Sequence, residues 1–393
     1  MNKAFVFVVC GAAEHTETLT IAHEYLRLRT KFPIYIITDQ QRNEIPIALS
    51  HVIDVATPAE YTNHQAAIYL KTGLHRFLPA GFNYAYLDTD ILAIGNNIDE
   101  VFEEFKSPIT FAPDHCVVQD FSAYAVNCGC LQTWQSDWDR YQAAYDELDQ
   151  NKTLNLTKEL NTQKLVLLQY FADIQTKFFI RLFYALKYMF AFRKFKLKNT
   201  FVFDKKHRVW QNLSGEILLY ETPNKAIAKS AGLRYHSLLR TWKTSSGKPL
   251  WEAKCTHLNT ALKQKFATPE IPATWQHWNG GFFLFNDESK AFLDRWHEWS
   301  VALFTDPKFK TRDQGSLIAT VWIMGLNEHP TLHQKWNFLL DYHSNQIVFN
   351  AAQETFRIQN GAFFKPEFVH VYHHWNDSSW DLWQWLLSKK IPA

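Results

Sequence analysis

The stretch YAYLDTDILAIG, from Tyr84 to Gly95, decides the fold because two aspartates interrupt an otherwise apolar run. The apolar residues before Asp88 are typical of a strand that is buried on both faces, and such strands form mostly parallel sheets covered by helices. In an extended chain, side chains two residues apart leave the same face, so Asp88 and Asp90 can converge on one divalent cation. Alternatively, the two carboxylates cap the turn after an exposed strand end. Spacing alone leaves both interpretations open.

The neighbouring sequence alternates between strand and helix patterns up to residue 115. Further strands are predicted at 3–11, 33–39, 51–55 and 108–114, and helices at 17–30 and 62–78. The first run also resembles the apolar part of a signal peptide, but we interpret it as a strand because a helix pattern follows at once. The alternation predicts an α/β fold with a mostly parallel sheet and helices on both faces. Ligands bind such sheets beyond the carboxyl ends of the strands, where Asp39 and the two aspartates would lie.

A long segment of different character divides the chain. Between about 131 and 270 the sequence predicts mainly helices, including a helical stretch over 158–198, and a hairpin around Asn212 to Gly215. The strand pattern resumes at WNGGFFLFN, from Trp278 to Asn286, and further helices follow it. With 393 residues, the chain is long enough for two domains. We therefore expect three parts, which are 1–130, a mainly helical insertion or second lobe at 131–270, and 271–393.

Composition argues against several classes of protein. The formal net charge of +2 disfavours a nucleic-acid-binding protein that works through bulk electrostatics. No stretch reaches the ~20 apolar residues that a membrane-spanning helix needs. Aromatic residues make up 16% of the chain, and Trp and Tyr have flat faces that suit sugar rings, although most of them are expected to fill the core.

The five cysteines are odd in number and widely spread. A disulfide framework is therefore not expected, and a reducing, cytoplasmic compartment is favoured. Cys128 and Cys130 are separated by one glycine, but the sequence shows no second matching pair. We therefore expect no zinc site there and interpret the cysteines as small buried thiols.

The stretch from Lys177 to Lys198 carries seven basic residues and no acidic one. As one helix it would place most basic residues on one face and most Phe and Leu residues on the other, which is the pattern of a helix in an anionic membrane interface. The alternative is a helix that covers the main domain and exposes a solvated basic face. The terminal segment 380–390 is a second candidate. Peripheral attachment to the inner face of a membrane is thus one expectation.

Four segments resemble, in this order, motifs of GT-A glycosyltransferases. The region RFLPAGFNYAYLDTDILAIGN, preceded by a helix that carries Lys71, is similar to their D-x-D region, most closely to that of family 8, the retaining galactosyltransferase and glycogenin-like group, and its relatives. WNGGFFLFN is similar to the family strand F-N-[AS]-G-V-x-L-x-N, RDQGSL to the helix start D-Q-D-x-L, and FVHVYHHW to the C-terminal H-F-x-G-x-x-K-P-W. The resemblance covers residues 1–115 and 275–375. It implies a GT-A fold, which is a Rossmann-like, mostly parallel sheet with helices on both faces.

The resemblance also implies roles for individual residues. A divalent metal, Mn²⁺ or Mg²⁺, would be held by Asp88, Asp90 and His370, and the imidazole nitrogen favours manganese. The donor and its transferred sugar would contact Asp39, Lys71, Asp88, Asn279, Gly280 and Gly281. The residues nearest to the reacting carbon would be Gln314 and Asp313. Structural alternatives are a core histidine for His370, a solvated lysine for Lys71, a turn cap for Asp39 and a helix N-cap for Asp313.

The sequence departs from the family pattern at two places. Gly315 stands where the family has the second aspartate of D-Q-D. After His370 there is no glycine and no Lys-Pro-Trp, so the residue that closes over the diphosphate is not identified, and His373 or His374 would replace His370 if the register were different.

Together these features predict a metal-dependent enzyme that moves a sugar from a nucleotide donor, with UDP as the expected nucleotide, to a glycan or glycolipid acceptor with retention of configuration. Residues 1–130 would bind the nucleotide sugar, and residues 271–393 would form the acceptor and catalytic half. A sugar nucleotidyltransferase would need a glycine-rich basic loop after the first strand, and CGAAEHTET has one glycine and no Lys or Arg. A glycoside hydrolase would need carboxylates ~5–10 Å apart. A non-catalytic, aromatic-rich carbohydrate-binding protein is the alternative from another class.

Overall fold

The computed structural model describes residues 1–393 except 238–239, 251–253, 311–312, 343–345, 360 and 391–393. The chain folds as two compact units. The first is built from two separate stretches, Met1–Gly129 and Lys254–Ala393, and the second consists of Cys130–Ala253.

A six-stranded sheet with the order β3-β2-β1-β4-β13-β6 forms the centre of the first unit. Its parallel strands are β1 (Asn2–Val9), β2 (Ile34–Thr38), β3 (Val52–Asp54) and β4 (Phe82–Leu87). β13 (Gln276–Phe285) runs antiparallel between β4 and β6 (Thr110–Val117). The predicted α/β class with a mostly parallel sheet is confirmed. The sequence pattern did not indicate the direction of β13.

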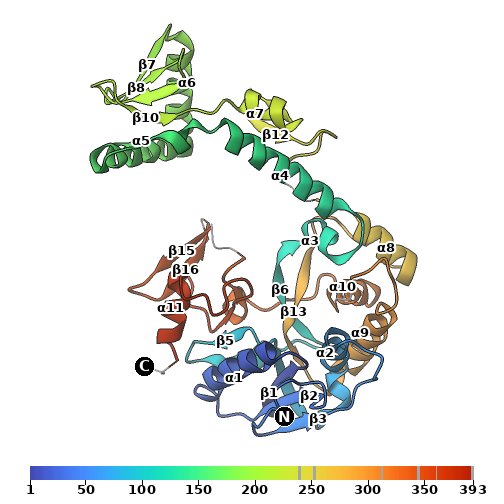
Figure 1. The fold of residues 1–393 in the computed structure, drawn as a ribbon. Coiled ribbons are helices and arrows are strands. Elements are labelled where there is room, and N and C mark those ends of the chain that lie inside the picture. The colour runs from blue at the N-terminus through green and yellow to red at the C-terminus, as the bar shows by residue number, and fades with distance from the viewer. Residues whose placement is uncertain (238–239, 251–253, 311–312, 343–345, 360, 391–393) are drawn as a thin grey trace. The chain divides into compact units, whose positions relative to one another are not determined.

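Helices cover both faces of this sheet, which explains why β1 is apolar throughout. Phe5 and Phe7 face the core shared with α1 (Ala13–Arg27), and Val6 and Val8 face the core shared with α2 (Asn63–Thr72) and α9 (Lys290–Ala302). Figure 1 shows α1 on one side of the sheet and α2 and α9 on the other. Because both faces are covered, a ligand can reach the sheet only at its edges and strand ends.

The helix predicted at 62–78 is shorter in the structure. It begins with a capping box, in which Thr62 Oγ1 accepts a hydrogen bond from the Gln65 amide at 3.2 Å and Gln65 Oε1 accepts one from the Thr62 amide at 2.9 Å. α2 ends at Thr72 with Gly73 as its C-cap, and a 3₁₀ turn, η1 (Leu74–Arg76), follows. The cap fixes the start of the helix whose last turn carries Lys71.

A small second sheet brings the C-terminal segment to the end of β4. It has the order β14 (Phe338–Leu339), β17 (Phe368–His370) and β5 (Ile91–Ala93). β17 runs antiparallel to β5 with His370 opposite Ile91, and the Val371 amide donates to the Asp90 carbonyl at 3.0 Å. This pairing fixes the register that places His370 beside the two aspartates.

The C-terminal helix α11 (Asp381–Ser388) is part of the main core. Trp383 is 2% exposed and Leu386 is fully buried, and the Tyr25 hydroxyl of α1 donates to the Leu386 carbonyl at 2.9 Å. Trp383 and Leu386 of the segment 380–390 are therefore part of the core of the first unit, whereas Leu387 is 42% exposed.

The second unit combines helices with a sheet, so the expectation of a mainly helical segment is incomplete. Its helices are α4 (Cys130–Leu148), α5 (Lys158–Thr176), α6 (Phe178–Phe190) and α7 (Asn224–Ala231). A four-stranded antiparallel sheet has the order β10 (Ile217–Tyr220), β9 (Val209–Gln211), β8 (Phe201–Asp204) and β7 (Lys194–Leu197). Figure 1 labels β7, β8 and β10 of this sheet. The hairpin predicted around Asn212 to Gly215 is confirmed by the pairing of β9 (Val209–Gln211) with β10 (Ile217–Tyr220).

The predicted helical stretch over 158–198 is interrupted once and is wrong after Phe190. Lys177 separates α5 from α6, and α6 ends at Phe190. Residues Lys194–Leu197 form β7, which pairs with β8 (Phe201–Asp204). Phe195 and Leu197 are buried whereas Lys194 and Lys196 are exposed, which is the two-residue period of a strand. In the part of the chain that the structure describes, no helix is both long and apolar enough to cross a bilayer.

Candidate active site

One pocket of about 190 Å³ contains nearly all of the residues to which the sequence assigned a role. It lies where β4 ends. Its lining includes Lys71, Asp88, Asp90, Asn279, Gly280, Gly281, Asp313, Gln314 and His370. These residues come from both stretches of the first unit, so the fold rather than the local sequence assembles the pocket.

Asp88, Asp90 and His370 form a compact cluster of ligand atoms. One oxygen of each carboxylate and one imidazole nitrogen all lie within 4.8 Å of one another. His370 Nε2 lies 3.1 Å from Asp90 Oδ1, and this oxygen is buried and accepts no aligned hydrogen bond from the described residues. A buried carboxylate oxygen that accepts no hydrogen bond costs free energy unless a cation or a hydrogen-bond donor compensates it. Two carboxylates and one imidazole are a suitable donor set for a divalent metal such as Mn²⁺.

Electrostatics within the cluster favour bound positive charge. Burial raises the pKa of Asp88, and the neighbouring Asp90 carboxylate raises it further, although Lys71 opposes both effects. Burial lowers the pKa of His370, but Asp90, together with Asp88 and Asp341, outweighs burial and holds the imidazole pKa above its ordinary value. Burial raises the pKa of Asp90, but His370 lowers it below its ordinary value. Asp88 and His370 therefore hold protons more tightly than isolated side chains would, and a divalent cation can take their place.

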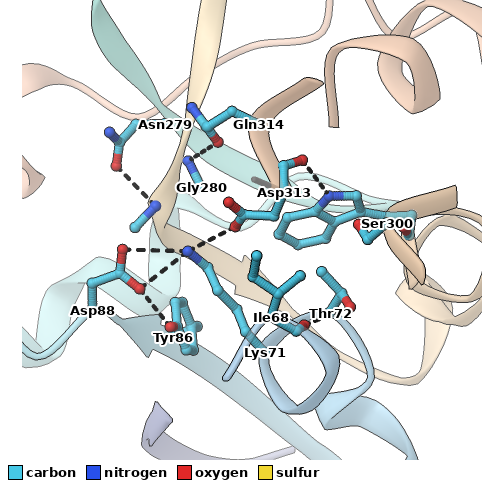
Figure 2. A network of polar contacts seen from close by, with 12 residues as sticks. Ile68, Lys71, Thr72, Tyr86, Asp88, Asn279, Gly280, Ser300, Asp313 and Gln314 are labelled. Atoms are coloured by element: carbon cyan, nitrogen blue, oxygen red, sulfur yellow. Dashed lines mark hydrogen bonds and ion pairs between the residues drawn. The ribbon is translucent and has the colours of Figure 1, made fainter. Parts of the chain in front are cut away.

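Lys71 bridges two carboxylates and is not a solvated lysine. Its Nζ lies 3.1 Å from Asp88 Oδ1 and 2.9 Å from Asp313 Oδ2, and its side chain is 13% exposed. Figure 2 shows Lys71 reaching from α2 to a position between these two aspartates. Burial lowers the pKa of Lys71, but Asp313 and Asp88 more than compensate and keep the ammonium group charged. Lys71 thus links the cluster of Asp88, Asp90 and His370 to the first residue of α10 (Asp313–Ile323).

Tyr86 is a site residue that the sequence analysis missed. Its buried hydroxyl donates to Asp88 Oδ1 at 2.5 Å (Figure 2). Tyr86, Asp88 and Asp90 are spaced two residues apart, so the alternation that aligned the aspartates also pointed to the tyrosine. The hydroxyl orients the Asp88 carboxylate from within the sheet.

Two glycines of β13 let the backbone approach the pocket. A Cβ on Gly281 would lie 2.8 Å from Asp88 Oδ2 and 2.9 Å from His370 Cε1, and a Cβ on Gly280 would lie 2.6 Å from Gln314 Oε1. The Gly281 carbonyl instead accepts the Asp88 amide at 2.8 Å. The pairing of β13 with β6 shifts register between Asn279 and Phe283, so the strand is irregular at the pocket.

Asp114, at the end of the run PITFAPD, organises the amides of the pocket. Its Oδ2 accepts from Asn279 Nδ2 at 2.9 Å and from Gln314 Nε2 at 3.3 Å. Gln314 Oε1 in turn accepts the Gly280 amide at 2.9 Å. Burial raises the pKa of Asp114, but His277 and His115 lower it well below its usual range. The sequence signal was available, because in PITFAPD an aspartate follows an apolar run, as it does in YAYLD, although β6 continues to Val117.

Aromatic side chains form another wall that the sequence analysis did not identify. Tyr342 and Tyr372 line the pocket with their rings stacked at a centroid distance of 5.9 Å, and His115 stacks on Tyr342 at 3.9 Å. Tyr372 is 57% exposed. These rings offer a flat and partly exposed surface in the lining of the pocket.

Asp39 does not line this pocket. Its carboxylate accepts from the Thr57 hydroxyl at 2.6 Å, the Thr57 amide at 2.8 Å and the Gln41 amide at 3.2 Å, and it contacts Arg42 Nε at 3.3 Å. Burial raises the pKa of Asp39, but the hydrogen bonds from Thr57 lower it below its ordinary value. These contacts are those of the turn cap that was the structural alternative.

His373 and His374 do not replace His370 in the cluster. Their backbone amides donate to Asp341 Oδ2, and the His374 ring pairs with Asp377 Oδ2 at 2.9 Å. The β5 and β17 register therefore selects His370 from the three histidines of FVHVYHHW.

The first unit is thus an α/β fold with a pocket of two aspartates and one histidine at a strand end. No protein-family model and no curated protein matches the chain. Similar solved structures include the bifunctional glycosyltransferase WbbM, with 8% identity over all of this chain and 50% of WbbM at a TM-score of 0.40, and mouse xyloside xylosyltransferase 1, with 12% identity over 94% of this chain and 97% of that one at 0.35. GlyE, a glycosyltransferase of Streptococcus pneumoniae TIGR4, matches 28% of this chain and 29% of its own at 14% identity and a TM-score of 0.21. The chain spans less than two thirds of WbbM and of GlyE.

Proposed function

We propose that the protein is a metal-dependent glycosyltransferase that moves a sugar from a nucleotide sugar, with UDP as the nucleotide, to a glycan or glycolipid acceptor with retention of configuration. The observation that carries the proposal is the cluster of Asp88, Asp90 and His370, which shares one pocket with the amide groups of Asn279 and Gln314. Carboxylates and imidazole bind a divalent metal, whereas amides bind sugar hydroxyls in paired hydrogen bonds.

Asp88, Asp90 and His370 would hold Mn²⁺ or Mg²⁺, which would neutralise the diphosphate as the glycosidic bond breaks. The protein's own contribution is to fix these ligands in advance. Tyr86 and Lys71 hold the Asp88 carboxylate, and the β5 and β17 pairing holds His370. Such preorganised groups act most strongly in a site that excludes water.

Gln314 is our choice for the residue nearest to the reacting carbon. Its Oε1 accepts from Gly280 and its Nε2 donates to the Trp278 carbonyl at 3.0 Å, so the orientation of the amide is fixed. Asp313 faces Lys71 at 2.9 Å and therefore presents less free negative charge to the sugar. We assign Asp313 to holding Lys71 and to the sugar hydroxyls.

Tyr342 and Tyr372 are suited to the acceptor. Sugar rings stack on aromatic faces through their apolar C–H surfaces, and the exposed Tyr372 ring is part of the pocket lining. An acceptor ring that stacks there would leave the deeper polar wall to the donor sugar.

The second unit offers a surface for an anionic membrane. No side chain of α6 is buried, and Phe179, Phe190 and the adjoining Phe192 are 81%, 85% and 101% exposed. The stretch from Lys177 to Lys198 carries seven basic residues and no acid. Aromatic side chains inserted among lipid head groups, with basic residues beside them, bind anionic bilayers. We infer that the enzyme acts peripherally at the cytoplasmic face of a membrane.

A thermal-shift panel tests the assignment. We expect UDP with Mn²⁺ to raise the melting temperature more than either does alone, and Asp88→Ala and Asp90→Ala to abolish that shift and the transfer of sugar from UDP-sugars. Glu100→Gln, an exposed acid outside the pocket, is the matched control. Variants as active as the parent with Mn²⁺ would refute the proposal. A shift with free glycans but not with UDP would identify a carbohydrate-binding protein, and a shift with nucleoside triphosphates a nucleotidyltransferase.

A further inference from the structure

A second group of metal-ligating side chains lies outside the pocket. Cys128 follows α3 (Val118–Ala125), Cys255 and His257 lie at the start of α8 (His257–Phe266), and Cys130 is two residues after Cys128. One ligand atom from each of these four residues lies within 4.8 Å of all the others. The partner of the Cys128 and Cys130 pair is therefore Cys-Thr-His at 255–257, which the long intervening sequence conceals.

The distance between the sulfurs fits a shared metal and not a disulfide. Cys128 Sγ and Cys255 Sγ are 4.0 Å apart. Two thiolates on tetrahedral zinc, each at ~2.3 Å from the ion, are about 3.8 Å apart, whereas a disulfide requires ~2.05 Å. All five cysteines fall within the described ranges, and none of them forms a disulfide.

Local backbone geometry turns the ligands toward one another. Gly129 has a φ of +71°, a left-handed conformation that L side chains rarely adopt. A Cβ on Gly129 would meet no atom within 4 Å, so the conformation rather than space calls for glycine. The Cys255 amide donates to the Gln119 carbonyl of α3 at 3.1 Å, which anchors the other pair.

A neighbouring serine is placed to support a thiolate. Ser122 Oγ lies 2.9 Å from Cys255 Sγ, and it accepts the Leu258 amide at 2.9 Å. A hydroxyl that already accepts an amide proton is free to donate its own proton to a thiolate. Such contacts with the neighbours of a metal ligand orient the ligand and stabilise its charged form.

We propose that Cys128, Cys130, Cys255 and His257 bind one Zn²⁺ ion in a structural site. Three thiols and one imidazole fill a tetrahedral coordination sphere, so no position is left for a substrate. The three thiols lose their protons to solvent as the Zn–S bonds form, and neutral His257 donates its nitrogen lone pair. The ion ties the end of α3 to the start of α8, which pack in the same core. Phe121 of α3 lines the active-site pocket, so the zinc site also supports one wall of that pocket.

Zinc analysis of the full chain purified from zinc-supplemented cells tests the proposal. We expect about one zinc per chain, and at least a several-fold lower content in the Cys128→Ser/Cys255→Ser variant. His257→Cys keeps four ligands and should retain the ion. Cys10→Ala changes a buried thiol outside the cluster and should also retain it. The Asp88→Ala/Asp90→Ala variant should retain zinc too, which separates this test from that of the proposed function.

Cobalt provides a readout that does not depend on the folding of a variant. The wild-type chain loaded with Co²⁺ should show the intense visible bands of tetrahedral, thiolate-bound cobalt, and added Zn²⁺ should remove them. Weak octahedral bands only, a zinc content far below one per chain, or equal loss of zinc from Cys10→Ala would overturn the proposal.

Discussion

The ammonium group of Lys71 lies 2.9 Å from a carboxylate oxygen of Asp313, and both side chains are only 13% exposed. This ion pair joins α2 to α10 across the pocket, and Asp88 shares the same lysine. Removing one partner of a buried ion pair leaves an uncompensated charge, which costs more than the pair contributed.

We therefore predict that Lys71→Met lowers the free energy of unfolding by about 3 kcal/mol. The double variant Lys71→Met/Asp313→Asn should recover part of the loss, because it removes one of the two unpaired carboxylates. Urea unfolding of the parent, both single variants and the double variant measures the coupling. Additive effects would show that Lys71 and Asp313 do not interact.

Gly281→Ala should weaken metal binding without a large loss of stability. The new Cβ would crowd Asp88 Oδ2 at 2.8 Å and His370 Cε1 at 2.9 Å, and so displace two proposed ligands. We expect a 10- to 100-fold weaker affinity for Mn²⁺, the roughly 10–100-fold range for disturbed ligand orientation. Isothermal titration measures it. Gly315→Ala is the control, because its Cβ meets only Leu258 Cδ1 at 3.7 Å, and parent-like Mn²⁺ affinity in Gly281→Ala would contradict the prediction.

Gln314→Glu should reduce turnover more than it changes substrate affinity. The amide nitrogen of Gln314 faces two acceptors, the Trp278 carbonyl at 3.0 Å and Asp114 Oδ2 at 3.3 Å, and a carboxylate oxygen there would be repelled. We expect kcat to fall by roughly 10²–10³-fold, as for loss of one positioned group, with a smaller change in KM. Steady-state kinetics decide the question. An increase in KM alone would assign Gln314 to donor binding rather than to the reacting carbon.

Stability should fall below neutral pH because of His297, which is 4% exposed in α9. Burial, and then the charge of Arg76, lower the pKa of His297 to about 4 from 6.5. The unfolded chain therefore binds a proton that the folded chain does not between these two values, so stability decreases as the pH falls from about 6.5 to about 4.

Replacing His297 with Gln should flatten this part of the stability profile. Chemical unfolding at a series of pH values measures how the free energy of unfolding changes with pH. In the parent protein this slope should include the uptake of one proton by His297. The comparison variant is His75→Gln, because burial also lowers the pKa of His75. The His75 ring pairs with Asp294, which lies one turn before His297 in α9. An unchanged slope in His297→Gln would show that the imidazole is charged in the folded state.

The exposed phenylalanines of α6 should determine membrane binding. We expect the parent to float with vesicles that contain phosphatidylserine, and to bind far less to neutral phosphatidylcholine vesicles or at high salt. Phe179→Ser/Phe190→Ser should lose most of this binding, whereas Phe363→Ser, which changes a 44% exposed side chain of the first unit, should not. Equal binding to neutral and anionic vesicles would contradict an electrostatic surface.

The sequence patterns predicted those features that depend only on residues close together in the chain. The two-residue spacing of Asp88 and Asp90 and the strand after Trp278 needed only a few neighbouring residues to be recognised. Asp114 escaped notice although, like Asp88, it follows a run of buried residues. Cys255 and His257 could not be paired with Cys128 because their proximity depends on a chain reversal over the whole second unit.

Other features depended on stretches of sequence that fit both the helical period and the two-residue period of a strand. The stretch FRKFKLK fits a basic helix face and also alternates between apolar and charged residues. Pairing with β8 decides for the strand, and Phe195 and Leu197 are buried in its core. The role of Lys71 was likewise decided by partners from remote positions, because Asp313 lies far along the chain.

The position of β13 sets an order of events during synthesis. β13 lies between β4 and β6, yet it leaves the ribosome only after the entire second unit. At ~5–20 residues per second, the edges of β4 and β6 wait roughly 10–30 s for their common neighbour. The second unit is complete in the nascent chain while the main sheet is still open, and unpaired strand edges of this kind attract chaperones and other strands. When β13 arrives, Gly281 meets Asp88, but the pocket is complete only after Asp313, Gln314 and His370 have followed, because these residues also line it.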